Sequence, residues 1–326
     1  MYNKNNLIIN IGFVALFFLL VIFTGYSEFS ESNRAKQKYV KTDEKSYFED
    51  IKYFKLELKR PMAKLFSSYL EIINNDKLLF NNPEGVYYSN ENIIHYSADN
   101  GTLLQSRKFL KLNGNVRVSE KSSQYVGHNL TYDGNDQVLK GWGGVEAQHT
   151  DMKTLDQLEL KAQDLISNLK TEKMELFKDV KGRIIRKHKY EGDMNFTSEY
   201  MMLKSLESLV KIEKKVKIDR NNYHLESGSA EIFLENFNKK LKYYVLYDDV
   251  KLEEKLVIPG KKPQLRKAYS EKLEGHQRSA KVILTGAPRV EQGEDIIQGY
   301  QITLRENVEL VEVDDAQSSF NLKKDK

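Results

Sequence analysis

The residues of this chain that could do chemistry are few in kind. The six histidines have no H-x-H or H-E-x-x-H spacing and stand far apart, at His95, His128, His149, His188, His224 and His276. The chain has no cysteine, which excludes thiolate catalysis, disulfides and Cys-ligated metals. The glycine-rich Trp142-Gly143-Gly144 lacks the lysine and helix start that phosphate binding needs. We therefore expect no catalytic residues, no metal site and no cofactor.

Charged side chains supply carboxylates along strands and two basic clusters in loops. Glu309 and Glu312 alternate with apolar neighbours, which is typical of the solvated face of a sheet. The clusters could meet the phosphates of a bound headgroup, although a charge run is usually a solvated loop. The headgroup candidates are Arg183, Arg186, Lys187, Lys261, Lys262 and Arg266. The net charge of +4 is too small for the electrostatic footprint of a nucleic-acid binder.

One strand pattern occurs twice, displaced by 172 residues. The first copy reads Leu112-x-Gly114-x-Val116-x-Val118 and then Gly127-x-x-Leu130-x-Tyr132; the second reads Leu284-x-Gly286-x-Pro288-x-Val290 and then Gly299-x-x-Ile302-x-Leu304. Apolar residues at period two predict half-buried strands, and the glycine-bearing gaps predict tight turns. Unless two hairpins share the pattern by chance, the protein stacks similar β-layers along one apolar surface.

The alternating apolar positions of both copies are candidates for a surface that shelters lipid. If they line an open slot, acyl chains could be held there by about 25 cal/mol per Å² of apolar area buried. Closed-core packing is the alternative at every one of these positions. Open edge strands would pair with the edge of another protein. The groove candidates are Leu112, Val116, Val118, Leu130, Tyr132, Leu284, Val290, Ile302 and Leu304.

The first 60 residues differ from the rest in composition. Residues 7–26 carry no charge, and about 20 apolar residues span a bilayer as a helix. We expect an uncleaved transmembrane anchor over residues 1–27; a cleaved signal peptide is the alternative, although no A-x-A-like site follows. The basic residues on either side of the anchor mildly favour a cytoplasmic bulk and leave the topology open.

Residues 28–60 form a polar spacer, in which apolar residues at three- and four-residue steps predict a short helix: Tyr47, Phe48, Ile51, Phe54 and Leu58. Alternating runs with turn signals predict strands from Pro61 onward. Residues 150–173 could be an amphipathic helix or two strands, and their flanks favour strands; residues 201–219 are ambiguous too. A boundary near residues 185–190 would give two modules, 61–187 and 188–316, followed by a polar tail, 317–326.

Residues 61–316 resemble the lipopolysaccharide-export families LptC and LptA, the latter OstA-like. Residues 82–98 and 112–118 resemble LptC, and residues 280–304 resemble the end of LptA. The resemblance implies an all-β fold, in which one N-terminal transmembrane helix precedes an antiparallel β-jellyroll or β-taco. It implies a single-pass inner-membrane protein with its bulk in the periplasm.

The resemblance also implies a function without enzymatic activity. The protein would take lipopolysaccharide from an inner-membrane ABC transporter toward the outer membrane. It would dock by strand edges to the transporter and to a soluble bridge protein or a second copy. Two other functions stay open: an anchored β-scaffold of a cell-envelope complex that carries no lipid, and an enzyme on envelope polysaccharide, which needs a carboxylate pair assembled by the fold.

Overall fold

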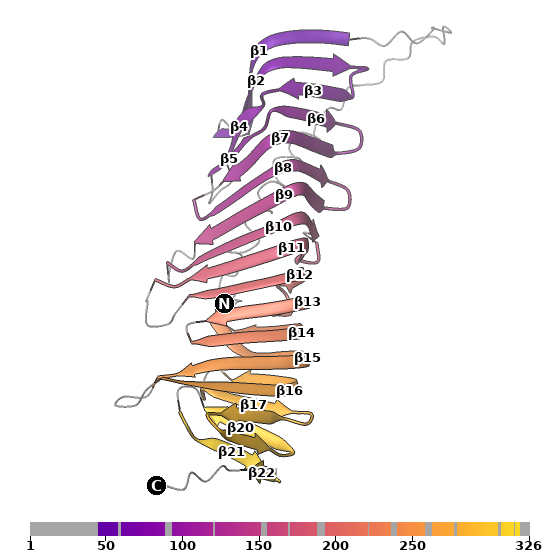
Figure 1. Ribbon diagram of the computed structural model, residues 1–326. Coiled ribbons are helices and arrows are strands. Elements are labelled where there is room, and N and C mark those ends of the chain that lie inside the picture. Colours follow the sequence, from indigo (N-terminus) through magenta and orange to yellow (C-terminus); the bar gives the residue numbers. More distant parts are fainter. Residues whose placement is uncertain are drawn as a thin grey trace, which may run out of the picture. The chain divides into compact units, whose positions relative to one another are not determined.

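The computed structural model describes residues 45–57, 60–88, 93–119, 121–150, 155–168, 170–187, 193–220, 222–235, 240–257, 263–276, 279–305, 308–315 and 317–319. Within these ranges all 22 regular elements are β-strands, and they pair antiparallel (Figure 1). The prediction of an all-β antiparallel fold is confirmed. No helix in these ranges could cross a membrane, and the expected anchor, residues 1–27, lies outside them.

The chain divides into two compact units. Unit 1 comprises Met1–Met152 and Gln163–Glu172; unit 2 comprises Lys153–Ala162 and Lys173–Lys326. Unit 1 contains β1 (Lys45–Glu57), β2 (Arg60–Ile73), β3 (Lys77–Asn81), β4 (Glu84–Tyr88), β5 (Ile93–Ser97), β6 (Asn100–Leu104), β7 (Phe109–Ser119), β8 (Ser123–Asp133) and β9 (Val138–Thr150). The division falls inside β10 (Gln157–Asn168).

Unit 2 contains β11 (Lys173–Ile185), β12 (Met194–Lys204), β13 (Leu209–Arg220), β14 (Tyr223–Glu235), β15 (Lys240–Leu256), β16 (Gln264–His276), β17 (Lys281–Thr285), β18 (Arg289–Gln292), β19 (Asp295–Gln298), β20 (Gln301–Arg305), β21 (Val311–Asp314) and β22 (Gln317–Ser319). The two predicted modules, which meet between residues 187 and 188, stay a prediction.

The long strands bend near their middle, where the pairing register shifts by one residue. On five alternate strands the bend is a pair of residues with positive φ: Gly114-Asn115, Gly143-Gly144, Lys178-Asp179, Lys214-Lys215 and Asp248-Asp249. Such bulges turn a strand and strengthen its local twist. Each long strand is thereby split into two halves.

On several other strands, a buried serine lies at the bend. The Oγ of Ser198 donates to the carbonyl of Tyr200 (3.1 Å), and that of Ser227 donates to the carbonyl of Ser229 (3.0 Å). Ser67 and Ser270 make the same bond to the residue two positions on, at 2.7 and 3.0 Å. These bonds satisfy backbone carbonyls at the bend, where the ladder is interrupted.

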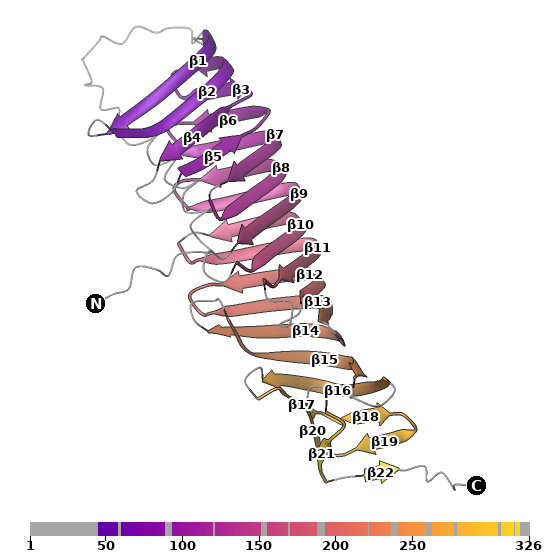
Figure 2. The same ribbon diagram turned by 90° about the vertical axis from the view of Figure 1, so that its left-hand side faces the viewer.

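The strand halves form two walls in each unit. In unit 1, wall A comprises β3, β6, the second half of β2 and the first half of β7, whereas wall B comprises β4, β5 and the other halves. In unit 2, β16 pairs through its second half with β17, followed by β20 and β21 (wall A). Its first half pairs with β18, followed by β19 and β22 (wall B), and Figure 2 shows the two sets as separate.

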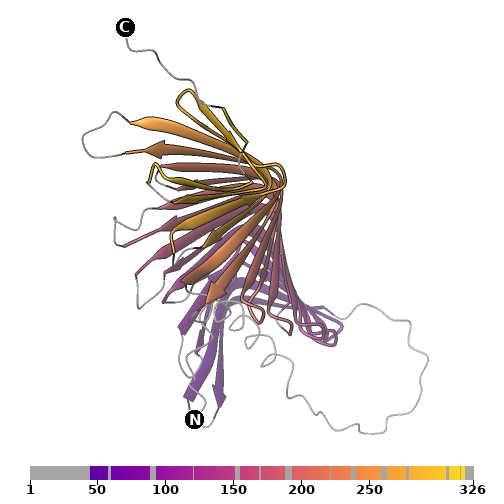
Figure 3. The same cartoon turned by 90° about the horizontal axis from the view of Figure 1, so that it is seen from below.

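The apolar core of each unit lies between its walls. Burial alternates along the strands, as on β17, β20 and β16, so that every second side chain faces inward. In unit 2, coloured from pink through orange to yellow in Figure 3, the strands diverge from the line of bends. The ladder hydrogen bonds therefore run within each wall, and the bends and side-chain contacts join one wall to the other.

The structure confirms the repeat. Leu112 faces Leu130 across β7 and β8, and Leu284 faces Ile302 across β17 and β20, again 172 residues on. Gly114 and Gly286 share a left-handed backbone, with φ of 72° and 77°. Their carbonyls accept from the amides of Asp99 (2.8 Å) and Glu271 (3.1 Å), which also differ by 172 positions. The two copies therefore form equivalent bent pairs of strands.

The short helix predicted in the spacer is wrong. Residues 45–57 form β1, which pairs along its length with β2. The aromatic residues that suggested a helical face are exposed, from 46% at Phe48 to 56% at Tyr47, so no buried stripe exists for a helix to form. Residues 150–173 contain β10 and the preference for strands there is confirmed; the ambiguous residues 201–219 lie in β12 and β13.

Candidate functional site

The candidate site is the apolar interior between the walls. All nine groove candidates point into it, and each is at most 8% exposed. Those on β7 and β8 line unit 1, and those on β17, β18 and β20 line unit 2. Their use by a lipid stays a prediction, but the structure does place each of them on an inner face.

The interior is packed in this structure. A side chain on the face of an uncovered sheet keeps a large part of its surface, whereas Val116, Leu284 and Ile302 keep none. Atoms of the opposite wall must therefore cover them. An acyl chain can reach these positions only if the walls part, and parting breaks no ladder hydrogen bond because those bonds run within each wall.

Aromatic rings fill the interior where neighbouring strands carry glycine. Tyr96 lies over Gly85, and Phe196 lies over Gly182, its cross-strand partner, so closely that a Cβ on either glycine would meet the ring at about 2 Å. Burial raises the pKa of the Tyr96 hydroxyl above its ordinary range. The tyrosine is neutral at every physiological pH, which suits a dry interior.

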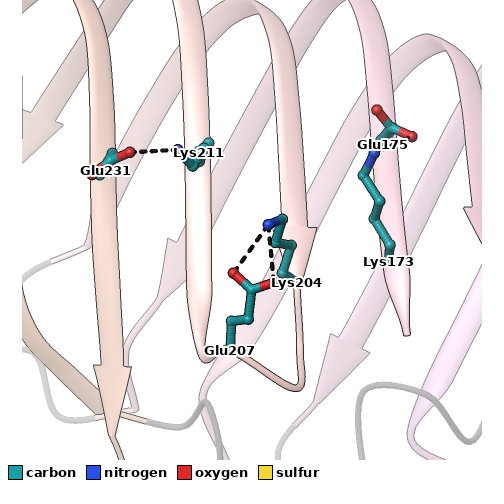
Figure 4. A network of polar contacts seen from close by, with 6 residues as sticks. All are labelled: Lys173, Glu175, Lys204, Glu207, Lys211 and Glu231. Atoms are coloured by element: carbon teal, nitrogen blue, oxygen red, sulfur yellow. Dashed lines mark hydrogen bonds and ion pairs between the residues drawn. The ribbon is translucent and has the colours of Figure 1, made fainter. Parts of the chain in front are cut away.

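The outer faces of the walls carry paired charges. On wall A of unit 2, Lys211 donates to Glu231 on the neighbouring strand (2.6 Å), and Lys204 pairs with Glu207 (2.9 Å) across a turn (Figure 4). The hydrogen bond that Lys211 donates to Glu231 raises the pKa of Lys211. Apolar residues inside and paired charges outside give each wall one dry face and one wet face.

The first basic cluster lies among carboxylates. Arg183 is 3.4 Å from Asp193, and Nη1 of Arg186 is 2.8 Å from Asp156. The backbone N–H of Lys187 also donates to Asp156 (3.0 Å). These partners offset much of the positive charge that a headgroup would meet. In the second cluster, Lys261 and Lys262 lie outside the described residues.

Arg266 is not part of a surface loop, contrary to its place in the expected headgroup cluster. It lies on β16 facing inward, is fully buried, and pairs with the fully buried Glu254 on β15. Sequence reasoning missed Glu254 altogether. Its signal was the alternation Val250-x-Leu252-x-Glu254-x-Leu256, which puts this carboxylate on the apolar face of its strand.

Among the described residues, no group of three or more His, Asp and Glu side chains could hold a metal ion. The site combines an apolar interior and strand edges with one buried ion pair.

Two family models of lipopolysaccharide-transport proteins match the chain. The family model "Lipopolysaccharide-assembly, LptC-related" matches residues 13–186, and "LptA/(LptD N-terminal domain) LPS transport protein" matches residues 195–309. One similar solved structure is LptH, the LptA homologous periplasmic component of the lipopolysaccharide transport device from Pseudomonas aeruginosa. It is 13% identical, with 40% of this chain and 95% of that chain covered and a TM-score of 0.36. None of the curated proteins matches. Because the first match spans more than half of the sequence, the chain belongs to the LptC-related family of lipopolysaccharide-assembly proteins.

Proposed function

We propose that this protein is a membrane-anchored lipopolysaccharide carrier whose two-walled interior shelters acyl chains. Residues 7–26 would hold it in the inner membrane, with the β-units in the periplasm. It would receive lipid from an inner-membrane ABC transporter and pass it toward the outer membrane. The observation that carries the proposal is the apolar inner face present in both units, on which all nine candidate positions lie.

The energetics are favourable for a saturated chain. Each methylene removed from water contributes about 0.8 kcal/mol, so about ten methylenes contribute about 8 kcal/mol. Opposing this gain, parting the walls separates inner side chains such as Leu130 and Leu284 from the side chains that cover them. The acyl chain then packs against these same side chains, which offsets much of the cost of opening.

Free strand edges would carry the lipid from one protein to the next. Among the strands that the structure describes, β1 pairs with β2 alone, β21 with β20 alone and β22 with β19 alone. An extended edge offers backbone donors and acceptors to a strand of another protein. Because β1 follows the expected anchor, we assign it to the transporter, and β21 and β22 to the soluble bridge protein or to a second copy.

Site-specific photocrosslinking in cells tests the proposal. A photoreactive residue replaces Val116, Leu130, Val290 or Ile302, all buried on inner faces, and the matched control is Lys255, which faces outward on β15. We expect lipopolysaccharide adducts at the four inner positions and none at Lys255. Protease resistance of each variant confirms that it is folded.

The packed interior favours a second candidate function, an anchored β-scaffold that carries no lipid. The observation is that Val116, Val290 and Ile302 have no exposed surface, as in an ordinary closed core. Folded variants without any lipid adduct at the four positions would contradict the transport proposal and leave the scaffold.

A further inference from the structure

One charged pair lies inside the apolar interior of unit 2. Arg266 and Glu254 are both fully buried and face each other across β16 and β15. Nε of Arg266 donates to Oε2 of Glu254 (3.0 Å), and its Nη2 donates to the same oxygen. Their neighbours on the same face, Leu252 and Ala268, are apolar and at most 2% exposed. Among the described residues that are buried, these two are the only charged ones.

The guanidinium also reaches the opposite wall. Its Nη1 donates to the carbonyl of Val308 (2.9 Å) and its Nη2 to the carbonyl of Arg305 (3.0 Å). Arg266 belongs to the half of β16 that pairs with β18, in wall B. Arg305 ends β20, in wall A, and Val308 lies in the turn between β20 and β21. These two bonds therefore join the walls directly.

The bonds lie far from the bend. The bend of β16 is at Ser270, four positions from Arg266, and Arg305 faces Lys281, which in turn faces His276 at the far end of wall A. The two walls are covalently continuous at the bends and separate at their other ends. Arg266 thus ties together the ends that would part first.

A need for stability does not explain the pair. A buried ion pair costs desolvation of both charges, and well-packed apolar residues of similar size are often equally or more stabilising. The best-attested role of a buried ion pair is to favour one structural arrangement of a protein over another. Here the selected arrangement is the closed one, because two of the four bonds exist only while Arg305 and Val308 lie against wall B.

We propose that Arg266, oriented by Glu254, is a latch that closes the interior of unit 2 along its open side. Release of the carbonyls of Arg305 and Val308 frees this end of wall A and lets the walls part, admitting an acyl chain from the side. This inference rests on the proposed function only for the ligand, an acyl chain. The closing of the walls by Arg266 does not depend on it. Glu254 keeps the guanidinium in place in the open state.

Thiol accessibility tests the latch, since any cysteine introduced into this chain is its only one. Ala268→Cys places a thiol one pleat inward from Arg266, and Ala230→Cys places a matched thiol on β14 in the same unit; both alanines are 1% exposed. Labelling by a maleimide is measured on the full chain in detergent. The latch is removed by the double substitution Arg266→Met with Glu254→Leu, which leaves no charge unpaired and keeps the interior apolar.

We expect the double substitution to speed labelling of Ala268→Cys by at least about tenfold, because two charge-assisted hydrogen bonds no longer oppose opening. Labelling of Ala230→Cys should stay within about twofold, since a local opening does not expose β14. Arg266→Lys, which keeps the charge but lacks the planar fork, should give an intermediate rate. Equal labelling of Ala268→Cys with and without the latch would overturn the proposal, and so would an equal rise at both thiols.

A second readout separates the latch from the lipid. Photocrosslinking from Ile302 to lipopolysaccharide is repeated in the latch-free background, where we expect more adduct than in the wild type. Faster labelling of Ala268→Cys without any lipid adduct in either background would keep the latch and refute the carrier function. Lipid adducts together with unchanged labelling of Ala268→Cys would support the carrier function and refute the latch.

Discussion

At the scale of single residues, the interior depends on glycines that lie beneath aromatic rings. Gly182 is the clearest case, because a Cβ there would lie 1.8 Å from the ring of Phe196. Gly275 repeats the arrangement beneath Tyr244. The ring occupies the space that a side chain on the glycine would fill. Each pair therefore combines a large aromatic side chain with a glycine, and the interior stays closely packed.

Gly182→Ala should therefore lower the free energy of unfolding by about 1–3 kcal/mol, because the ring of Phe196 must move out of its place. In a Phe196→Leu background the same substitution should cost less, since the smaller side chain leaves room. Urea unfolding of the two single variants and the double variant gives the coupling. Lys181→Ala, on the outer face of β11, is the control. Additive effects would contradict the close contact.

A second residue-scale prediction concerns pH. The ring of His224 is hydrogen-bonded to Asp219 (2.6 Å) and lies 3.4 Å from Glu226. The bond to Asp219, with a smaller effect of Glu226, raises the pKa of His224 against the opposing effect of partial burial. Since the folded pKa exceeds the unfolded value of about 6.5, the stabilisation is complete below that pH and disappears as the pH rises through the folded pKa.

His224→Gln should then reduce the free energy of unfolding more at about pH 5.5 than at about pH 8.5. Urea unfolding at the two values measures the difference, and the NMR titration of the His224 ring gives the pKa directly. Asp219→Asn removes the main partner and should shrink the pH dependence in a chain that keeps His224. A larger loss at the alkaline value would show that the sign is wrong.

At the scale of elements, a period of two in the sequence was sufficient to predict most strands and the repeated hairpin. This prediction succeeded because most strands have one face toward an apolar interior and one toward water. β1 escaped this reasoning because both of its faces are exposed, so Tyr47 and Phe54 follow no burial pattern. The bonds of Arg266 to residues 305 and 308 could not be predicted, since they depend on how a distant turn lies against the other wall.

β1 gives a prediction of its own. Its exposed aromatic residues lie on an edge strand with one described partner, which is the usual setting for pairing with another chain. Phe48→Lys with Phe54→Lys should weaken self-association or partner binding and change the free energy of unfolding by no more than about 0.5 kcal/mol. Sedimentation of the full chain in mild detergent measures the association.

The matched control for β1 is Leu206→Lys. Leu206 is 70% exposed but lies in the turn between β12 and β13, away from a strand edge. It should leave sedimentation unchanged. If Leu206→Lys had the same effect as the β1 variant, general surface hydrophobicity and not the strand edge would cause the association.

At the scale of the whole molecule, contacts within each unit run mainly between elements close in sequence. β7, β8 and β9 pair in order in unit 1, and β11 to β16 pair in order in unit 2. A structure built by nearest neighbours behaves as a one-dimensional array, in which damage to one layer is felt by the adjacent layers and fades beyond them. Such a protein can open locally, as a carrier of acyl chains must.

Hydrogen exchange tests this local behaviour of the layers at two equivalent positions. Val116 on β7 and Val250 on β15 each follow a bulge and are at most 1% exposed. Alanine at either position should cost about 1–3 kcal/mol, because a cavity replaces two buried methyl groups. Val250→Ala should speed exchange in β14 to β16 and leave β7 to β9 unchanged, and Val116→Ala should do the converse.

Lys251→Ala, on the outer face next to Val250, is the control. Faster exchange throughout both units from either substitution would mean that the chain unfolds as one cooperative body, and that local parting of the walls is not available to it.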